Sequence, residues 1–229
     1  MRNFLRVQEA GAPHQVGAFF DVDNTLVPGP AIELRFFHHL RRRGLVGSRE
    51  AARSLWHLVR HLPPWSVQPL RERKLYLEGK HPSAIEPLAE GFIQSEILPR
   101  LSQDGVAALE AHQRAGHFVV FLTGSLDFLI APLAHVLEVK TVLAARPERT
   151  NDRYTGQLAT VLPYGEGKRR LVETLARDEG LTLRHSYAYG DSPGDTETLA
   201  AVGHPTVVNP IRGMSRIARR NGWKVVEWK

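Results

Sequence analysis

The chain of 229 residues contains no cysteine, which excludes disulfide bonds and cysteine-based zinc sites. It also lacks an apolar run that could cross a membrane, since such a helix needs about 18 consecutive apolar residues or more. Residues 1–15 do not contain the apolar core of a signal peptide. These absences predict a protein of the cytoplasm.

The remaining composition is that of an ordinary globular chain, with 42% apolar and 24% charged residues. The length suits one domain, or one domain with an insertion. A formal net charge of +6 favours anionic partners such as phosphate esters, nucleic acid or an anionic membrane surface. The basic runs 41–43 and 216–220 are typical of solvated helix faces. Contact with anionic lipid is the alternative, and no nucleic-acid-binding motif accompanies them.

An apolar segment over residues 16–21 ends in two carboxylates, Asp21 and Asp23. Residues two apart in a strand face the same side, so both carboxylates are expected to emerge together where the strand ends, beside the amides of Asn24 and Thr25. Close carboxylates repel each other unless a cation or a shared proton holds them. The pattern indicates a nucleophilic or metal-binding pair, although a plain turn also favours Asp and Asn.

Residues 28–100 show apolar residues at helical spacing and no strand-like alternation. The pattern includes Phe36 and continues over residues 49–62, 67–78 and 83–97. We therefore predict a small helical bundle at 28–100, inserted directly after the first acidic loop. Residues 1–27 and 101–229 are predicted to form the other domain.

Strands and helices alternate after residue 101. Strands are predicted at 117–122, 140–144, 185–189, 206–209 and 224–228. Helices are predicted at 106–115, 127–136, 167–178, 195–201 and 212–220, and residues 149–160 form a hairpin or flap. Apolar strands that alternate with helices indicate an α/β fold with a parallel sheet covered on both faces.

Ligands of such sheets bind outside the carboxyl ends of the strands. Polar residues follow several predicted strands at that position, namely Asp21 and Asp23, Thr123, and then Asp191 and Asp195, with Lys168 at the start of a helix. Separate loops thus bring carboxylates, a hydroxyl and an ammonium to one edge of the sheet.

This set of groups suits phosphoryl transfer from a monoester. Asp21 can attack phosphorus and form an aspartyl-phosphate, and Asp23 can protonate the leaving oxygen and then deprotonate water. Thr123 and Lys168 can hold phosphate oxygens. Asp191 with Asp21 forms an oxygen site suited to Mg²⁺.

Each residue also has a simpler interpretation when it is considered alone. Thr123 can cap a helix, and Lys168 can be a solvated side chain. Asp191 and Asp195 can belong to a turn and a helix cap. Only the convergence of these residues on one edge favours the catalytic interpretation.

The ordered set resembles the four motifs of haloacid dehalogenase (HAD) superfamily phosphatases: Asp21-Val22-Asp23-Asn24-Thr25, Thr123, Lys168 and Gly190-Asp191-Ser192-Pro193-Gly194-Asp195. The resemblance covers about residues 16–210. The helical insertion is similar to the cap of the phosphoserine-phosphatase-like group, subfamily IB. The resemblance implies a Rossmann-like core and a helical cap that closes over a small phosphorylated metabolite.

The resemblance also implies a role for each motif residue. Asp21 would be the nucleophile and a Mg²⁺ ligand, and Asp23 the general acid and base, with its backbone carbonyl on the metal. Asp191 would ligate the metal, and Asp195 would support the metal site and Lys168. The implied phosphate-binding residues are Asn24, Thr123, Gly124 and Lys168. The candidates for substrate contacts from the cap are Glu33, Phe36, Arg71 and Arg73.

Two positions depart from the pattern of phosphoserine phosphatases. Pro30 stands where those enzymes have a Glu that binds the substrate ammonium, and Gly194 stands where they have an Asn. Glu33, one helical turn past Pro30, is the available substitute. We therefore expect hydrolysis of small phosphate monoesters without strong selectivity for phosphoserine. The alternatives are a phosphotransferase that uses the same aspartyl-phosphate and a non-catalytic anion-binding module.

Overall fold

The computed structural model describes residues 15–47 and 73–229. The predicted helical pattern over 49–62 and the cap candidate Arg71 lie outside these residues. In the described part of the chain, no helix is both long and apolar enough to span a bilayer.

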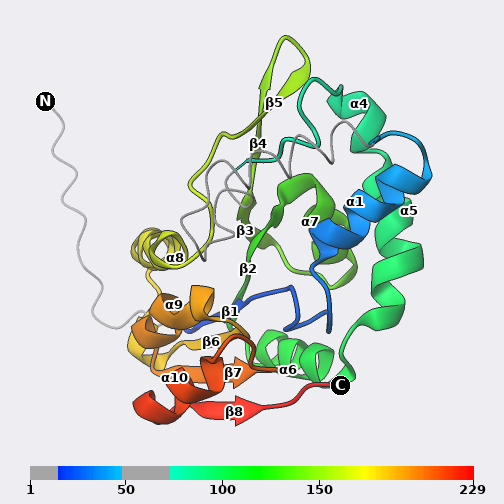
Figure 1. Ribbon diagram of the computed structural model, residues 1–229. Coiled ribbons are helices and arrows are strands. Elements are labelled where there is room, and N and C mark those ends of the chain that lie inside the picture. The colour runs from blue at the N-terminus through cyan, green and yellow to red at the C-terminus, as the bar shows by residue number, and fades with distance from the viewer. Residues whose placement is uncertain (1–14, 48–72) are drawn as a thin grey trace, which may run out of the picture.

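Six parallel strands form the central sheet, in the order β3-β2-β1-β6-β7-β8 (Figure 1). They are β1 (Gly17–Phe20), β2 (Phe118–Leu126), β3 (Thr141–Ala145), β6 (Tyr187–Gly190), β7 (His204–Val208) and β8 (Lys224–Val226). The predicted α/β fold with a parallel sheet is confirmed.

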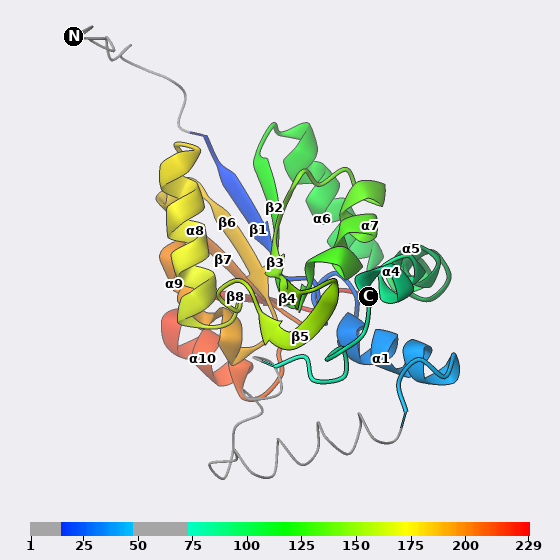
Figure 2. The same ribbon diagram turned by 90° about the horizontal axis from the view of Figure 1, so that it is seen from above.

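Helices cover both faces of this sheet, as the view in Figure 2 shows. One face carries α6 (Gln103–Arg114) and α7 (Asp127–Val136). The other carries α8 (Glu166–Asp178), α9 (Thr196–Ala201) and α10 (Met214–Asn221). Short 3-10 turns, η3 (Leu183–His185) and η4 (Pro193–Asp195), flank β6.

Burial on both faces explains why β1 is an unbroken apolar run. Ala18 and Phe20 belong to the hydrophobic cluster under α6 and α7, while Phe19 belongs to the cluster under α8, α9 and α10. All three are fully buried. Each buried Phe contributes about 1.5–3 kcal/mol relative to an exposed one. The strand that leads directly into Asp21 is therefore packed on both faces.

The predicted strand over 117–122 was too short. β2 continues to Leu126, and its pairing with β3 is irregular between Leu122 and Leu126. Leu126 is fully buried and pairs with Ala145, so core packing extends the strand through the polar residues Thr123 to Ser125. Thr123 therefore lies within the strand and not beyond it.

The predicted hairpin is confirmed as an antiparallel pair, β4 (Pro147–Thr150) and β5 (Arg153–Leu158). Its backbone also binds the segment 74–80, and residues 74–78 of this segment were predicted to end the helix over 67–78. The Lys74 amide donates to the Gly156 carbonyl at 2.8 Å, and the Gly79 amide donates to the Tyr154 carbonyl at 2.8 Å. The described part of that predicted helix is wrong, because these amides are engaged by the hairpin and the segment forms turns.

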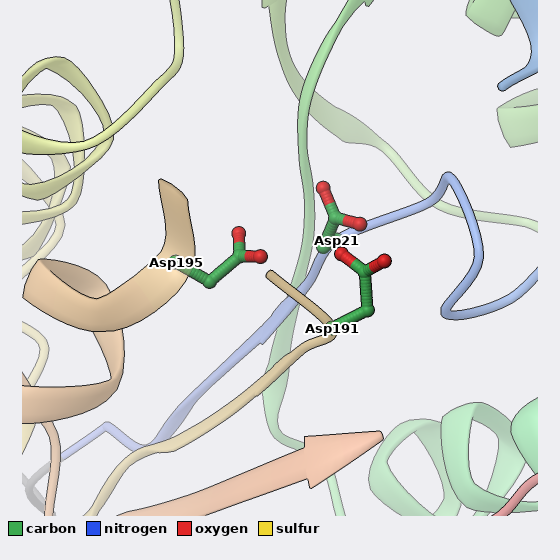
Figure 3. A group of neighbouring side chains, drawn as sticks. All are labelled: Asp21, Asp191 and Asp195. Carbon is green, nitrogen blue, oxygen red and sulfur yellow. The ribbon is translucent and has the colours of Figure 1, made fainter. Parts of the chain in front are cut away.

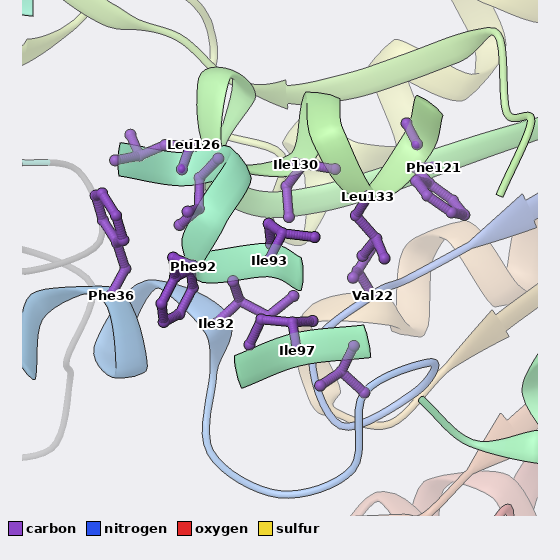
Figure 4. Close-up of a cluster of buried hydrophobic side chains, with 14 of the residues drawn as sticks. Val22, Ile32, Phe36, Phe92, Ile93, Ile97, Phe121, Leu126, Ile130 and Leu133 are labelled. Carbon is purple, nitrogen blue, oxygen red and sulfur yellow. The ribbon is translucent and has the colours of Figure 1, made fainter. Parts of the chain in front are cut away.

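The helices predicted in the other described segments between Pro30 and residue 100 are present. They are α1 (Ile32–Arg42), α4 (Pro82–Ile85), α5 (Leu88–Phe92), a π-helical turn η1 (Ile93–Ile97) and a 3-10 turn η2 (Leu98–Arg100). Figure 4 shows that Ile32, Phe92 and Ile93 pack with Ile130 and Leu133 of α7. The described cap helices thus share one hydrophobic cluster with the core. The domain boundaries at 28 and 100 remain a prediction.

Phe36 belongs to this cluster and not to a substrate surface. Its side chain is fully buried, with ring centroids 5.2 Å from Phe92 and 6.0 Å from Phe128. The prediction that Phe36 contacts substrate is therefore corrected. The helical spacing of apolar residues correctly placed Phe36 on one face of α1, and that face is the one buried in the core.

A pair of histidine rings lies beside the start of β2. The Nδ1 atoms of His112 and His117 are 2.7 Å apart, and His112 Nε2 lies 2.8 Å from the Tyr189 hydroxyl. The Tyr187 ring packs against both histidines. Burial, with repulsion from His117, lowers the pKa of His112 to about 4, and burial also lowers the pKa of His117. The pair is therefore held with little positive charge.

Replacing His112 by Gln should flatten the dependence of stability on pH between about pH 6.5 and 4. The unfolded His112 has a pKa of about 6.5, whereas the folded one lies near 4. As pH falls, the unfolded chain takes up this proton first. The contribution of His112 to the unfolding free energy is therefore complete above pH 6.5 and is lost progressively below it. We expect the difference in unfolding free energy between wild type and His112→Gln to change by about 1–2 kcal/mol, discounted for partial solvent access.

Urea unfolding at pH 7.5, 5.5 and 4.5 measures this difference. His135→Gln is the matched control, since His135 is exposed on α7 and should leave the pH dependence of wild type unchanged. A constant free-energy difference between wild type and His112→Gln across this range would contradict the prediction.

Candidate active site

A buried ion-pair network lies at the carboxyl edge of the sheet. Lys168, from the first turn of α8, places its Nζ atom 2.6 Å from Asp21 Oδ1 and 2.6 Å from Asp195 Oδ1. Only 4% of Lys168 is exposed. Buried charges persist when they are paired in this way. The predicted meeting of Asp21, Lys168 and Asp195 is present in the fold.

Asp21 and Asp191 form an acidic pair next to this network. They directly follow the strands β1 and β6. Carboxylate oxygens of Asp21, Asp191 and Asp195 all lie within 4.8 Å of one another, and Figure 3 shows the three carboxylates converging. Asp195 is already engaged, because its Oδ2 atom accepts hydrogen bonds from the amide and hydroxyl of Ser192 at 3.1 and 3.0 Å. Asp21 Oδ2 accepts one long hydrogen bond from the Thr25 hydroxyl, at 3.2 Å, and Asp191 Oδ2 accepts one from Asn24, at 2.9 Å. Asp21 and Asp191 therefore have more capacity left for a cation than Asp195.

Asn24 ties these loops together. Its Nδ2 atom donates to Asp191 Oδ2 at 2.9 Å and to the Asn209 carbonyl at 3.0 Å, and its Oδ1 atom accepts from the Gly29 amide at 3.0 Å. Asn24 has a φ of 56°, in the left-handed region that Asn tolerates better than most residues. The predicted phosphate ligand thus has a positioning role in this geometry.

Asp23 points away from the acidic cluster and toward the cap. Its carboxylate accepts hydrogen bonds from the Ile32 amide at 2.7 Å and from the Ser125 hydroxyl at 2.8 Å. Ile32 begins α1, so Asp23 links the first motif to the first cap helix. Among the described residues, the Asp23 side chain is not part of the carboxylate cluster. Its predicted contribution to the metal site is left to its backbone carbonyl.

Burial perturbs these groups strongly. It raises the pKa of Asp21 well above its usual range, against the attraction of Lys168, and it raises the pKa of Asp23, against the donors Ile32 and Ser125. Burial and then Asp195 raise the pKa of Asp191 to about 6. Burial alone would lower the pKa of Lys168, but Asp195 and Asp21 outweigh it and raise that pKa. A compensating cation is what the clustered carboxylates need to be charged together.

A cavity of about 420 Å³ opens above these residues. Gly124 and Ser125 line it, whereas Thr123 is fully buried and does not, among the described lining residues. The Thr123 hydroxyl accepts a hydrogen bond from the Ser125 amide at 3.1 Å. Thr123, which the sequence predicted to bind phosphate, therefore lies directly beneath the surface of the cavity.

Glu33 lines the same cavity from α1 and is held by two partners. Its Oε2 atom lies 2.6 Å from Lys74 Nζ, and its Oε1 atom accepts from the Tyr76 hydroxyl at 3.0 Å. Arg73, next to Lys74, is exposed and lines a neighbouring cavity instead. The cap thus presents a carboxylate that is already neutralised by an ammonium.

Comparison with known proteins agrees with this geometry. The sequence model of the haloacid dehalogenase-like hydrolases matches residues 18–200. The chain belongs to this family. The resemblance read from the four motifs is confirmed at that level.

Several relatives extend over most of this haloacid dehalogenase-like chain. Phosphoserine phosphatase SerB1 of Mycobacterium tuberculosis is 30% identical, over 93% of this chain and 70% of its own length. A histidinol-phosphatase of Neisseria meningitidis is 27% identical, over 93% and 98%. A Bordetella pertussis protein of unknown function has a crystal structure with a TM-score of 0.80 and 28% identity, covering 93% of this chain and 99% of that one.

Gly194, the fourth-motif residue that departs from the pattern of phosphoserine phosphatases, packs against the ring of Tyr164. A Cβ atom at position 194 would lie 2.2 Å from the Tyr164 ring, so the ring occupies the space of a side chain there. Tyr164 also lines the cavity beside Leu162 and Pro163. In this chain an aromatic ring replaces the side chain that the phosphoserine phosphatases were expected to carry.

Sequence analysis missed Ser125, Lys74, Tyr76 and Tyr164. Ser125 had a usable signal, because it stands two residues after Thr123 and thus on the same side of a strand. Lys74 and Tyr76 had none, since their partner Glu33 is far away in the sequence. Tyr164 became visible only through its packing on Gly194.

Proposed function

We propose that the protein is a Mg²⁺-dependent phosphatase that hydrolyses small phosphate monoesters through an aspartyl-phosphate on Asp21. The observation that carries the proposal is the placement of the Asp21 carboxylate in a cavity between Lys168 and Asp191. The family membership and the names of the relatives support the same reaction class. The cytoplasm is part of the proposal, supported by the absence of cysteine.

The first step is attack of an Asp21 oxygen on phosphorus. The bond from phosphorus to the ester oxygen breaks, and Asp23 gives its proton to the leaving alcohol. Asp23 then takes a proton from water, which attacks the aspartyl-phosphate and releases inorganic phosphate and Asp21. Lys168 and the backbone at Gly124 would bind the phosphate oxygens, since both line the cavity that holds Asp21. Asp195 holds Lys168, and Thr123 supports this loop from below.

The donor set fits a hard divalent cation, since buried carboxylate oxygens within reach of one another suit Mg²⁺. Asp21 and Asp191 would hold it, with the Asp23 backbone carbonyl and support from Asp195. When bound, the ion would offset negative charge on the phosphate and on the attacking carboxylate.

Phosphate release from a panel of monoesters, with and without Mg²⁺, tests the proposal. Chelation should stop hydrolysis, Mg²⁺ should restore it, and Ca²⁺ should inhibit because it favours longer distances and higher coordination numbers. Full activity after exhaustive chelation would contradict the metal dependence. If the ester is consumed in the presence of an alcohol without release of phosphate, the enzyme is a phosphotransferase. Binding without turnover would indicate an anion-binding module.

The same panel tests selectivity. Glu33 is neutralised by Lys74, so a substrate ammonium would gain little from it. We expect kcat/KM for L-phosphoserine within about tenfold of that for phosphoglycolate, glycerol phosphate and a sugar phosphate, because a missing charge-assisted contact costs about 1.5–3 kcal/mol. A hundredfold preference for phosphoserine would show that the cap binds the amine.

A further inference from the structure

Arg212 stands out among the cations that line the cavity. Among the described residues these are Lys74, Lys168 and Arg212. Lys168 and Lys74 are each within 2.6 Å of a carboxylate. Arg212 has no hydrogen bond or ion pair from its side chain to any residue in the described ranges 15–47 and 73–229. It is the cation of this set that an incoming anion can pair with without breaking an existing contact.

The backbone holds Arg212 at the mouth of the site. The Ile211 amide donates to the Asp191 carbonyl at 2.9 Å, and the Met214 amide donates to the Ile211 carbonyl at 2.9 Å. Arg212 itself has a φ of 52°, a left-handed conformation that is uncommon for residues other than Gly and is often found at functional positions. The turn that carries Arg212 is thus fixed to the loop that carries Asp191.

The surroundings of Arg212 favour contact with a leaving group. Ile211 is 37% exposed and Leu34, from α1 of the cap, is 50% exposed, and both line the same cavity. A group that extends from the phosphate toward the mouth passes apolar side chains of the core and the cap. Arg212 is itself exposed, so an anion there would form a partly solvated, charge-assisted pair with the guanidinium.

We propose that Arg212 is a specificity-determining residue that binds a second anionic group, a carboxylate or a second phosphate, on the leaving group of the substrate. This inference rests on the proposed phosphatase function and names the substrate class of the same site. It predicts that monoesters with a second anion on the leaving group are better substrates than analogues whose leaving group is uncharged.

The test compares matched substrates in wild type, Arg212→Ala and Arg212→Lys with Mg²⁺. The carboxylate pair is 3-phosphoglycerate and glycerol 3-phosphate. The phosphate pair is propane-1,3-diol bisphosphate and 3-hydroxypropyl phosphate. In Arg212→Ala we expect kcat/KM for the better substrate with an anionic leaving group to fall about tenfold, between the effect of an exposed ion pair and that of a buried one. The two substrates with an uncharged leaving group should change less than twofold, and Arg212→Lys should be intermediate.

Arg216→Ala is the matched control, because Arg216 is an exposed Arg on α10 that does not line the cavity. It removes the same net charge and should change no substrate more than twofold. An equal loss on the esters with uncharged and anionic leaving groups in Arg212→Ala would overturn the inference, since Arg212 would then serve the transferred phosphate. A loss below threefold on both esters with an anionic leaving group would also overturn it. The pair that responds shows which anion is bound.

Calorimetric binding separates this inference from the proposed reaction. In Asp21→Asn, which cannot form the aspartyl-phosphate, Arg212→Ala should remove the binding preference for 3-phosphoglycerate over glycerol 3-phosphate, or for the bisphosphate over 3-hydroxypropyl phosphate. If wild type hydrolyses none of the four esters but this binding preference is present and depends on Arg212, the proposed function fails and the inference stands. If no preference exists in either Asp21→Asn or wild type, the inference fails.

Discussion

Replacing Asp21 by Asn should lower kcat by about 10⁴-fold or more while the fold is retained. The amide has the volume of the carboxylate but lacks the charge that attacks phosphorus. Lys168 keeps its second partner, Asp195, at 2.6 Å, so the buried ammonium is not left alone. The loss should appear in kcat with little change in thermal stability. Steady-state phosphate release with the best ester of the panel measures it.

Asp178→Asn is the matched control for the nucleophile. Asp178 is exposed at the end of α8, and its replacement should leave kcat within twofold of wild type. Activity of Asp21→Asn above roughly 1% of wild type would reject Asp21 as the nucleophile, because deletion of a nucleophile costs orders of magnitude more. Retained activity would point to direct attack by water.

Replacing Lys168 by Met should affect both stability and turnover. Met is close in length to Lys but leaves the carboxylates of Asp21 and Asp195 buried without their ammonium. Breaking a buried ion pair in this way costs about 3–5 kcal/mol, and loss of a phosphate-binding cation costs about 10²–10³ in kcat. Urea unfolding in chelator at pH 7.5 and phosphate release with Mg²⁺ measure the two effects.

The pH dependence of the Lys168→Met effect has a definite sign. The pKa of Lys168 is raised in the fold, so its stabilisation is complete below its unfolded pKa of about 10.4 and is lost at higher pH. Measurements at pH 7.5 therefore capture it in full. In the variant, burial keeps the pKa of Asp21 well above its usual range, so protonation of Asp21 relieves the repulsion and the deficit should shrink at pH 5. Lys140→Met, at an exposed position, should show neither effect, and a deficit below about 1 kcal/mol at pH 7.5 would contradict the account.

The alternation of apolar strand segments with helical segments was enough to predict the sheet and the edge at which the motifs meet. Strands buried on both faces must be apolar throughout, and β1 shows this with Ala18, Phe19 and Phe20. Because connections between parallel strands return to the same end, Asp21 and Asp191 had to emerge at one edge. The contacts from Lys168 to Asp21 and Asp195 agree with that prediction.

Local pattern was a poorer guide where distant backbone groups compete for the same amides. Residues 74–78 belong to a predicted helical pattern, yet the segment forms turns that are held by hydrogen bonds of Lys74 and Gly79 to the hairpin of β4 and β5. The apolar period of α1 placed Phe36 correctly on one face but could not tell whether that face met substrate or core. Periodicity reports which side of an element is apolar, and the identity of the partner depends on the rest of the fold.

The motif spacing alone predicted the groups that are proposed to carry the chemistry, since a strand end and a helix start fix the positions of their own residues. The contacts that are proposed to set selectivity have no such local origin. The Glu33–Lys74 pair joins two segments of the cap, and Arg212 reaches the cavity because its turn binds the Asp191 loop. These contacts depend on how separate elements pack. Because packing sums interactions from the whole chain, it leaves no fixed spacing in the sequence.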